Sequence, residues 1–189
     1  SAASDVYKRQ VIDEVVKLAK EGNSFVVETR KGWRFRSLAV IAACGKAPRR
    51  LGIDVEERFV GRGLSYCVVC DGPLYRGKEV ALVSFGEKGV EGVEFLAPLV
   101  KKLHYVVPSE KDRSIETAKR FSNVEVYPGY RVVDIYGENK VKAVKIARQN
   151  EEKILEVDAL FVEIGFETKI DFLKPFVDIN ERGEVVVDI

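Results

Sequence analysis

The sequence predicts an α/β fold with a central parallel β-sheet of the nucleotide-binding type. Two observations lead to this prediction. Between residues 77 and 127, short apolar segments alternate with segments of helical period, in the order strand, helix, strand, helix, strand. Glycines follow the first of these strands, at the point where the chain is predicted to enter a helix, as in nucleotide-binding βαβ units.

The first part of the chain is predicted to contain one helix. Residues 1–10 fit no pattern that follows them, so we treat them as a non-native scar and exclude them from the fold prediction. The apolar residues of 11–20 lie on one helical face, and Gly22 stands where a helix often ends. A helix is therefore expected over residues 11–20.

A small β-meander is predicted next. Residues 24–45 favour two strands joined by a tight turn, with Trp33 and Phe35 pointing inward, and then a buried apolar strand that ends at Gly45. Residues 48–63 have mixed polarity and several glycines, which is typical of a connecting segment.

The remaining elements follow the α/β pattern. We expect, in chain order, a strand with a glycine turn at 77–86, a helix at 87–102, a strand at 103–108, a helix at 113–121, and strands at 124–127, 130–136, 141–148 and 155–165.

Charge and composition exclude several classes of function. The 189 residues include 31 basic and 30 acidic side chains, so no basic field exists that would attract nucleic acid or an anionic membrane. No apolar run approaches the roughly 20 residues of a membrane span, and we expect a cytoplasmic protein without membrane contact. Methionine is absent, so we expect the chain to be a piece of a longer protein.

Two cysteines, Cys67 and Cys70, have the spacing Cys-x-x-Cys, and the chain holds only one other cysteine, Cys44, and one histidine, His104. A redox pair is favoured, because two thiols at this spacing can close a disulfide and a helix start stabilises a thiolate. A zinc site would have to recruit both Cys44 and His104, which are distant in sequence. Two buried cysteines are disfavoured, because an Asp-Gly step directly after the pair is typical of an exposed turn.

Three segments carry a resemblance to a known family. Residues 61–83, GRGLSYCVVCDGPLYRGKEVALV, match the pattern Gly-x-Gly-x-Ser-x-Cys-x-x-Cys-Asp-Gly followed by a strand. Residues 38–53, LAVIAACGKAPRRLGI, are similar to an Ala-Thr-Gly-Ala-x-Pro-Arg stretch with Cys44 in place of the usual threonine, and residues 158–166, DALFVEIGF, are similar to a strand that re-enters a flavin domain. The chain thus resembles the low-molecular-weight thioredoxin reductases, which are FAD-dependent pyridine nucleotide-disulfide oxidoreductases, over nearly all of residues 11–189.

The resemblance implies how the domains are organised. Residues 64–165 would form a Rossmann-like nucleotide-binding domain inserted in an incomplete FAD-binding domain, which residues 11–63 and 166–189 would supply. The family's N-terminal Gly-x-Gly-x-x-Gly segment and its C-terminal Gly-Asp segment are missing, so this chain alone is not expected to hold FAD. Within the FAD-binding part, the backbone of Ala43, Cys44 and Gly45 would pass the flavin.

The same resemblance implies residue roles in the intact protein. Electrons would pass from FAD to the Cys67–Cys70 disulfide and then to thioredoxin or a similar small dithiol protein. Cys70 would face the flavin, Cys67 would attack the partner's disulfide, and Asp71 would donate a proton to a leaving thiolate, although a simple turn role for Asp71 stays open. The family's enzymes are homodimers, and we expect the same here.

The other candidate residues have structural interpretations. Cys44 is expected to be a small buried side chain, and His104, beside an apolar strand, is expected to be structural. Two rival functions stay open, namely a zinc-stapled binding module and a non-catalytic nucleotide-binding domain in which the cysteines are incidental.

The predicted dinucleotide turn departs from the family pattern. Instead of Gly-x-Gly-x-x-Gly or Ala, the chain has SFGEKG, in which only Gly86 and Gly89 remain, Phe85 is bulky and Glu87 would repel a phosphate. Residues 107–109, Val-Pro-Ser, replace the family's His-Arg-Arg cluster for the NADPH 2′-phosphate. We therefore expect NADPH to be a poor electron donor, and another reductant, such as a deazaflavin or a ferredoxin, to feed the flavin.

Overall fold

The computed structural model describes residues 10–181 and 183–187, and its contacts divide the chain into two compact units. Unit 2 comprises Pro48–Phe166, and unit 1 comprises the residues before and after it in sequence. The sequence predicts a boundary after residue 63, whereas residues 48–63 lie in unit 2. The reason is packing, because Phe59 is buried in the core of unit 2 and Leu51 packs against the same cluster.

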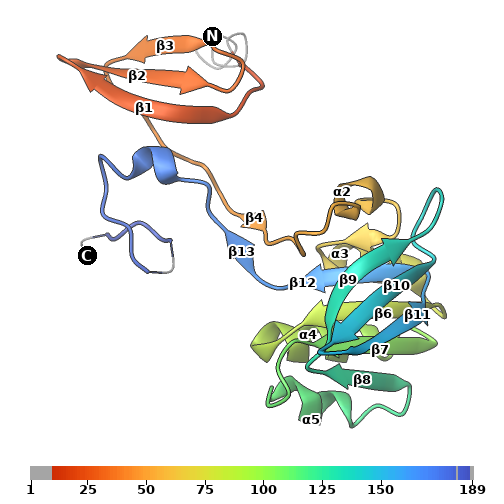
Figure 1. Ribbon diagram of the computed structural model, residues 1–189. Helices are drawn as coiled ribbons and strands as arrows, with labels where there is room; N and C mark the ends of the chain where they lie inside the picture. The colour runs from red at the N-terminus through yellow and green to blue at the C-terminus, as the bar shows by residue number, and fades with distance from the viewer. Residues whose placement is uncertain (1–9, 182, 188–189) are drawn as a thin grey trace. The chain divides into compact units, whose positions relative to one another are not determined.

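Unit 1 contains an antiparallel meander of three strands, β1 (Val15–Glu21), β2 (Ser24–Thr29) and β3 (Arg34–Ser37), in the order β1-β2-β3 (Figure 1). The helix predicted over residues 11–20 is therefore wrong, because most of this segment is β1. Its apolar pattern suits a helix in isolation, but the turn at Gly22, with φ of 60°, brings the segment back onto β2 as a ladder from Val15↔Thr29 to Glu21↔Ser24. Tertiary pairing thus overrides the local periodicity.

The inward orientation predicted for Trp33 and Phe35 is also wrong, since their exposed fractions are 58% and 41%. The buried strand predicted to end at Gly45 is absent, and residues 38–46 have no regular structure, with Ile41 93% exposed. In the described part of the chain, the core of unit 1 is small. It comprises Leu18, Ile170 and Leu173 with the partly buried Phe25, Val27, Phe172, Val177 and Ile179.

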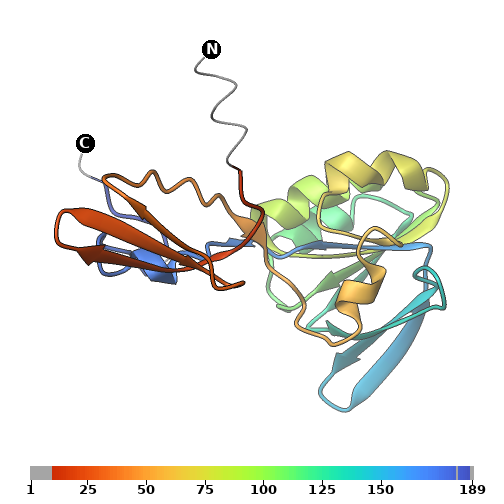
Figure 2. The same ribbon diagram turned by 90° about the horizontal axis from the view of Figure 1, so that it is seen from above.

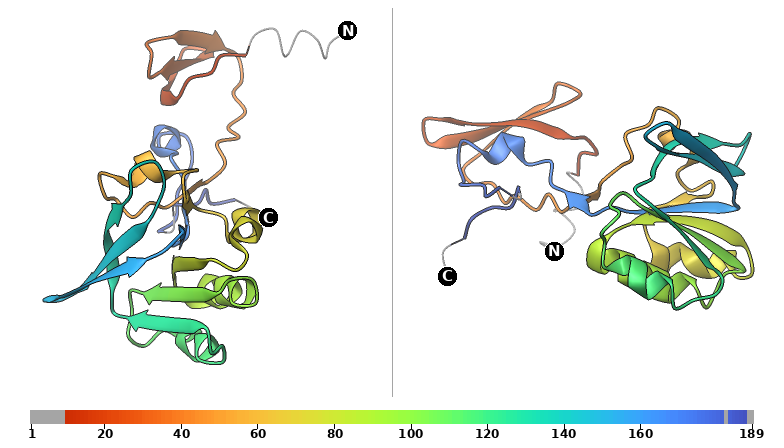
Figure 3. Two further views of the ribbon diagram at one scale, coloured as in Figure 1. Left: turned by 90° about the vertical axis from the view of Figure 1, so that its right-hand side faces the viewer. Right: turned by 60° about the horizontal axis from the view of Figure 1, so that its bottom comes forward.

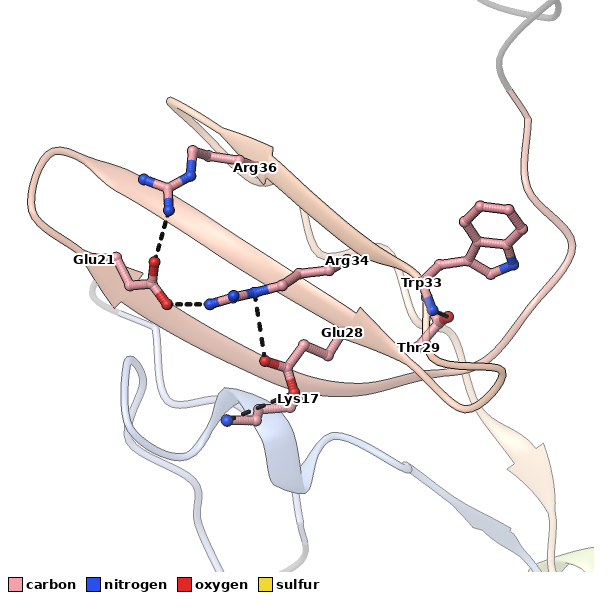
Figure 4. A network of polar contacts seen from close by, with 7 residues as sticks. All are labelled: Lys17, Glu21, Glu28, Thr29, Trp33, Arg34 and Arg36. Carbon is pink, nitrogen blue, oxygen red and sulfur yellow. Dashed lines mark hydrogen bonds and ion pairs between the residues drawn. The ribbon is translucent and has the colours of Figure 1, made fainter.

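Charged side chains cover one part of the meander (Figure 4). Glu21 forms ion pairs with Arg34 and Arg36, and Glu28 forms ion pairs with Arg34 and Lys17. All these side chains are at least a third exposed, so each pair contributes at most about 1 kcal/mol. The chain passes between the units at β4 (Ala47–Pro48) and β13 (Phe166–Glu167), two short strands that pair with each other, and a 3₁₀ turn, η2 (Asp171–Leu173), follows.

Unit 2 is built on the predicted parallel sheet. Its five strands, in spatial order, are β5 (Leu64–Ser65), β12 (Ala159–Glu163), β6 (Glu79–Ser84), β7 (Lys102–Val107) and β8 (Val124–Pro128). Every pairing in this sheet is parallel. The α/β prediction is confirmed, and the loops after β5, β6 and β7 leave the sheet at its carboxyl edge, where ligands bind in open α/β sheets.

Two layers cover the faces of this sheet, as Figures 2 and 3 show. On one face lie α4 (Gly86–Leu96) and α5 (Ser114–Ala118), and on the other lies an antiparallel sheet of β9 (Arg131–Tyr136), β10 (Ala143–Arg148) and β11 (Glu151–Glu156). Strand alternation directs the side chains of β6 to both layers. Leu82 packs in the helix-side cluster, and Val83 packs in the cluster that includes Val144 and Ile146.

Several predicted elements of unit 2 end elsewhere. The helix predicted over 87–102 stops at Leu96, and Pro98 follows, which cannot continue a helical ladder. The strand predicted over 155–165 is two strands, β11 and β12, because a turn at Val157-Asp158 separates them. The short strand β5 was not predicted, and neither were three short helical elements, namely α2 (Glu56–Phe59), α3 (Val68–Asp71) and the 3₁₀ turn η1 (Gly72–Tyr75). Across residues 10–181 and 183–187, the structure holds no helix with the length and apolar character needed to cross a membrane.

Candidate functional site

Cys67 and Cys70 are joined by a disulfide bond, with their Cα atoms 5.3 Å apart. The pair follows β5 at the carboxyl edge of the parallel sheet, and Cys67 is the N-cap residue of α3. The backbone N–H of Cys70 donates a hydrogen bond of 3.1 Å to the Cys67 sulfur. The sequence prediction of a disulfide between these residues is confirmed, while its reversibility stays a prediction.

The packing of Val68, between the two cysteines, and of Gly72, just after them, fixes this local structure. Val68 is 1% exposed and belongs to the core between the sheet and the helices, which anchors α3. Gly72 is buried against α4, because a Cβ atom there would lie 3.1 Å from both Leu96 and Phe95. Cys70 is exposed and Cys67 is half-buried, so the disulfide is accessible from solvent while its loop is held by the core.

Ser65 and Asp71 form a polar bracket around the disulfide loop. The Ser65 hydroxyl donates a hydrogen bond of 2.6 Å to Asp71 Oδ2, and the Cys67 N–H donates one of 3.0 Å to Ser65 Oγ. Nearby, burial first and the charges of Asp71 and Asp158 second raise the pKa of Tyr75. The hydrogen bond from Ser65 therefore fixes the carboxylate of Asp71, the residue directly after Cys70. The role of Asp71 as proton donor stays a prediction.

Glu163 is a site residue that the sequence analysis missed. It ends β12, the strand next to β5, and its Oε1 accepts a hydrogen bond of 3.0 Å from the Val68 N–H, the amide directly after Cys67. Its backbone carbonyl accepts a hydrogen bond of 2.7 Å from the Ser84 hydroxyl. The sheet topology could have identified Glu163, because the carboxyl ends of neighbouring parallel strands meet at one edge of a sheet. The pairing of β5 with β12, however, could not be predicted from the sequence.

The loop after β6 has the backbone of a dinucleotide turn. Gly86 has φ of 60° and begins α4, which matches the glycine requirement of such a turn. Its N–H, however, donates to both carboxylate oxygens of Asp112, at 3.0 Å each. Asp112 also accepts hydrogen bonds from the N–H and hydroxyl of Ser114, at 2.9 and 2.5 Å. Burial alone would raise the pKa of Asp112, and the hydrogen bonds from Ser114 and Gly86 outweigh it, so this pKa lies below its ordinary value.

Gly89 serves close packing between α4 and the neighbouring elements. A Cβ atom at this position would lie 2.0 Å from the Tyr105 hydroxyl and 3.0 Å from Ser114. The Tyr105 hydroxyl is itself hydrogen-bonded to Ser114 Oγ at 2.6 Å. At the helix start, Glu87 pairs with Arg113 at 2.7 Å, and Phe85 is 45% exposed. Gly86 and Gly89 thus both lie in the first turn of α4, and the N–H of Gly86 is hydrogen-bonded to the carboxylate of Asp112.

Ala43, Cys44 and Gly45 lie in unit 1, in the irregular segment between β3 and β4. All three are exposed, and Cys44 is a free thiol, so its predicted burial is wrong. Ala43 and Cys44 help line a hollow of about 900 Å³, together with apolar residues of β1, β2 and the C-terminal segment. Cys44 is exposed because the described part of unit 1 has no further layer to cover this segment.

His104 is structural, as predicted. It is 5% exposed in β7, its Nδ1 lies 3.0 Å from the Tyr127 hydroxyl, and burial lowers its pKa. Among the residues that the structure describes, no group of three His, Cys, Asp or Glu side chains could hold a metal ion. The zinc hypothesis, which needed Cys44 and His104 to join the pair as ligands, therefore has no support.

Comparison with known proteins defines the family. Residues 4–189 match the family model of the pyridine nucleotide-disulphide oxidoreductases. The chain belongs to this family. It is 33% identical over 192 aligned positions to an alkyl hydroperoxide reductase subunit of Staphylococcus aureus strain MRSA252, an alignment that covers 98% of the chain and 36% of that protein. It is 34% identical over 169 positions to thioredoxin reductase of Aquifex aeolicus, which covers 86% of the chain and 52% of that protein.

A solved structure gives the same family result. The crystal structure of T. acidophilum thioredoxin reductase matches with a TM-score of 0.70 and 30% identity, over 93% of this chain and 60% of that one. This pyridine nucleotide-disulphide oxidoreductase chain therefore spans about a third to a half of the length of the curated relatives it matches.

Proposed function

We propose that the intact protein is a thioredoxin reductase-like flavoprotein that passes electrons through Cys67 and Cys70 to a small dithiol protein such as thioredoxin. The observation that carries this proposal is the accessible Cys67–Cys70 disulfide with Ser65 and Asp71 bound around it. The similarity to thioredoxin reductases of Aquifex aeolicus and T. acidophilum supports it. Cytoplasmic location and a homodimeric intact protein belong to the same proposal.

The chemistry assigned to the pair is balanced thiol–disulfide exchange. The disulfide takes up two electrons and two protons and becomes two thiols. Cys67, as thiolate, attacks one sulfur of the partner's disulfide, and the partner's other sulfur leaves and takes a proton, for which Asp71 is the proposed donor. Cys70, as thiolate, then attacks the Cys67 sulfur, which releases the partner as a dithiol and restores the starting disulfide.

FAD, when bound, supplies the two electrons for this cycle. The residues proposed to pass it are Ala43, Cys44 and Gly45. Ala43 and Cys44 line the hollow in unit 1, whose wall combines apolar side chains such as Leu18 with charged ones such as Asp13, and a flavin ring needs both kinds of contact. Gly45 has φ of 64°, and a Cβ atom placed on it would meet no heavy atom within 4 Å, so its backbone is open to close approach. Cys70 is proposed to face the flavin, in agreement with its exposure.

We expect NADPH to be a poor donor, because the residues of the β6–α4 turn do not fit a dinucleotide. A pyrophosphate needs free backbone N–H groups at this turn, and that of Gly86 already serves both oxygens of Asp112. Two carboxylates, Asp112 and Glu87, stand where phosphate charge would be placed, and Arg113 is engaged by Glu87. A reductant of another class, such as a reduced ferredoxin or deazaflavin, is the proposed donor.

The test of the proposed function is thiol trapping on the intact protein. The protein is equilibrated in thiol–disulfide buffers of graded potential, alkylated and analysed by mass spectrometry. We expect Cys67 and Cys70 to gain and lose alkylation together and reversibly, while Cys44 labels independently of the potential. Two alkylatable thiols at Cys67 and Cys70 at every potential, or one zinc ion per chain in elemental analysis, would overturn the proposal.

A further inference from the structure

A carboxylate accepts a hydrogen bond from the backbone amide next to Cys67, the proposed nucleophile. Glu163 Oε1 accepts the Val68 N–H at 3.0 Å, and Val68 directly follows Cys67. Another amide of this short loop, the Cys70 N–H, donates to the Cys67 sulfur at 3.1 Å. Backbone N–H donors stabilise a thiolate, whereas a nearby negative charge destabilises it. Of these two amides, one faces the sulfur and the other is held by a negative charge.

The position of this carboxylate is set by contacts on both sides. Ser84 holds the Glu163 backbone at 2.7 Å, and on α4 the facing residue is Gly92. A Cβ atom at Gly92 would lie 3.7 Å from Glu163 Oε2, an ordinary contact distance, and 2.9 Å from Leu82, so this glycine serves the packing of α4 on β6 at a point directly beside the carboxylate. Glu163 is partly buried, which weakens the solvent screening of its charge.

The other charged groups around the loop do not cancel this charge. Asp71, on the far side of the pair, is also acidic, and Tyr75 is a neutral phenol whose pKa is raised. Lys88 of α4 interacts electrostatically with Glu163 but is bonded to Glu91 at 2.5 Å. When the disulfide is reduced, the two thiols therefore form near the carboxylates of Glu163 and Asp71. Lys88 is the cation that interacts with Glu163.

We propose that Glu163 is a positioning residue that holds the Val68 amide and, through its charge, makes the Cys67–Cys70 pair a stronger reductant. This inference rests on the proposed function. Reduction by a dithiol reagent converts the disulfide and two thiols of the reagent into two protein thiols and the reagent's disulfide. A carboxylate beside Cys67 disfavours its thiolate, so the reduced pair loses part of the stabilisation that it gains by ionising and gives up its electrons more readily.

The experiment compares three variants of the intact protein. Glu163→Gln keeps an oxygen acceptor for the Val68 N–H and removes the charge, Glu163→Asp keeps the charge, and Glu156→Gln removes a charge from an exposed position on β11 as a matched control. The pair is equilibrated with dithiothreitol or glutathione buffers and trapped by alkylation. In parallel, the rate of alkylation of the reduced pair is followed against pH.

We expect Glu163→Gln to shift the exchange equilibrium toward the dithiol by about tenfold, or about 30 mV for a two-electron couple. Its alkylation profile should move to lower pH, while Glu163→Asp and Glu156→Gln stay within about threefold of the unmodified protein. A Glu163→Gln equilibrium within twofold of the control, or equal shifts in Glu163→Gln and Glu163→Asp, would overturn the role of charge. A pair that does not cycle in the unmodified protein would instead overturn the proposed function.

Discussion

The loops after β5 and β6 leave the same edge of one sheet, both lead into a helix, and in each a carboxylate accepts the first amide of that helix, yet they differ in what they leave accessible. After β5, the carboxylates of Asp71 and Glu163 bind a hydroxyl and an amide around Cys67 and Cys70 and leave the disulfide accessible. After β6, the carboxylate of Asp112 binds the first amide of the helix itself. In the first loop the disulfide stays accessible to solvent. In the second loop Asp112 binds the amide that an anion would otherwise bind.

This difference teaches that the glycines of a βα turn can have purely structural reasons. The fold accounts for both Gly86 and Gly89, the first through its left-handed φ and the second through its close contact with Tyr105. Neither requirement involves a nucleotide. The pattern of glycines therefore reports the turn, whereas the groups hydrogen-bonded to its amides report whether a phosphate can bind.

The largest effect is expected at the disulfide. Cys67→Ser in the intact protein should lower the rate of partner reduction by about 10³-fold or more, because a serine hydroxyl does not replace a thiolate as nucleophile. Reduction of the flavin by the physiological donor should proceed as before. Anaerobic stopped-flow absorbance of the flavin, followed by a disulfide-reduction assay with thioredoxin, measures both steps.

The matched change is Cys70→Ser, which should leave electrons at the flavin. Partner reduction at the unmodified rate in either variant would contradict the assignment of these two residues as the path for electrons. Ser122→Ala, a change at an exposed position of unit 2 outside the proposed site, is the control and should leave the rate of partner reduction unchanged.

The next effect concerns the second loop. In anaerobic mixing, the intact protein should show no rapid, saturable bleaching of its flavin at micromolar NADPH, whereas dithionite reduces it. Each charge-assisted hydrogen bond lost to a phosphate costs about 1.5–3 kcal/mol, so several losses weaken binding by orders of magnitude. Asp112→Ala, which frees the Gly86 N–H, should strengthen NADPH binding by about tenfold or more, measured by the same titration. Saturable bleaching in the unmodified protein would refute this comparison.

Much of this contrast could be predicted from the sequence. The prediction failed where two hydrogen-bonded residues lie far apart in the sequence. The Cys-x-x-Cys spacing predicts the disulfide, and the βαβ order of residues 77–108 predicts the parallel sheet, because both depend on neighbours in sequence. Glu163 could not be predicted, since it lies 95 positions after the Val68 amide that it binds. Asp112, 26 positions after Gly86, escaped for the same reason.

The errors in unit 1 have a related physical cause. The apolar pattern of residues 11–20 suits two periods, and only the pairing with β2 decides for a strand. Trp33, Phe35 and Cys44 were expected inside on the basis of their apolar character, but hydrophobic side chains are buried only where another layer covers them. Sequence patterns alone carry no information on whether that layer is present in the chain.

The packing of the two loops can be compared directly with glycine substitutions. Gly89→Ala should destabilise α4 by about 1–3 kcal/mol, because its Cβ atom would lie 2.0 Å from the buried Tyr105 hydroxyl. Gly72→Ala should cost less, because the nearest side-chain atoms, those of Leu96 and Phe95, would lie 3.1 Å from its Cβ atom instead of 2.0 Å. Thermal unfolding and hydrogen exchange of the α4 amides measure both in the intact protein. Equal stability of the two variants would show that the contact at Gly89 relaxes freely.

The smallest effect is a dependence of stability on pH at the second loop. The pKa of Asp112 is lowered in the folded chain, so its carboxylate contributes stability that is present above the unfolded value of about 3.9 and is lost as the pH falls through the folded pKa. Asp112→Asn should therefore cost about 1 kcal/mol at pH 7, the typical value of a helix-capping carboxylate, and progressively less below pH 4. Asp54→Asn, at an exposed position of unit 2, is the control and should show no such convergence. Hydrogen exchange of the Gly86 amide between pH 3.5 and 7 follows the effect at the bond itself. If its protection in Asp112→Asn stayed equal to that of the unmodified protein at pH 7, the carboxylate would not be what holds the turn closed to phosphate.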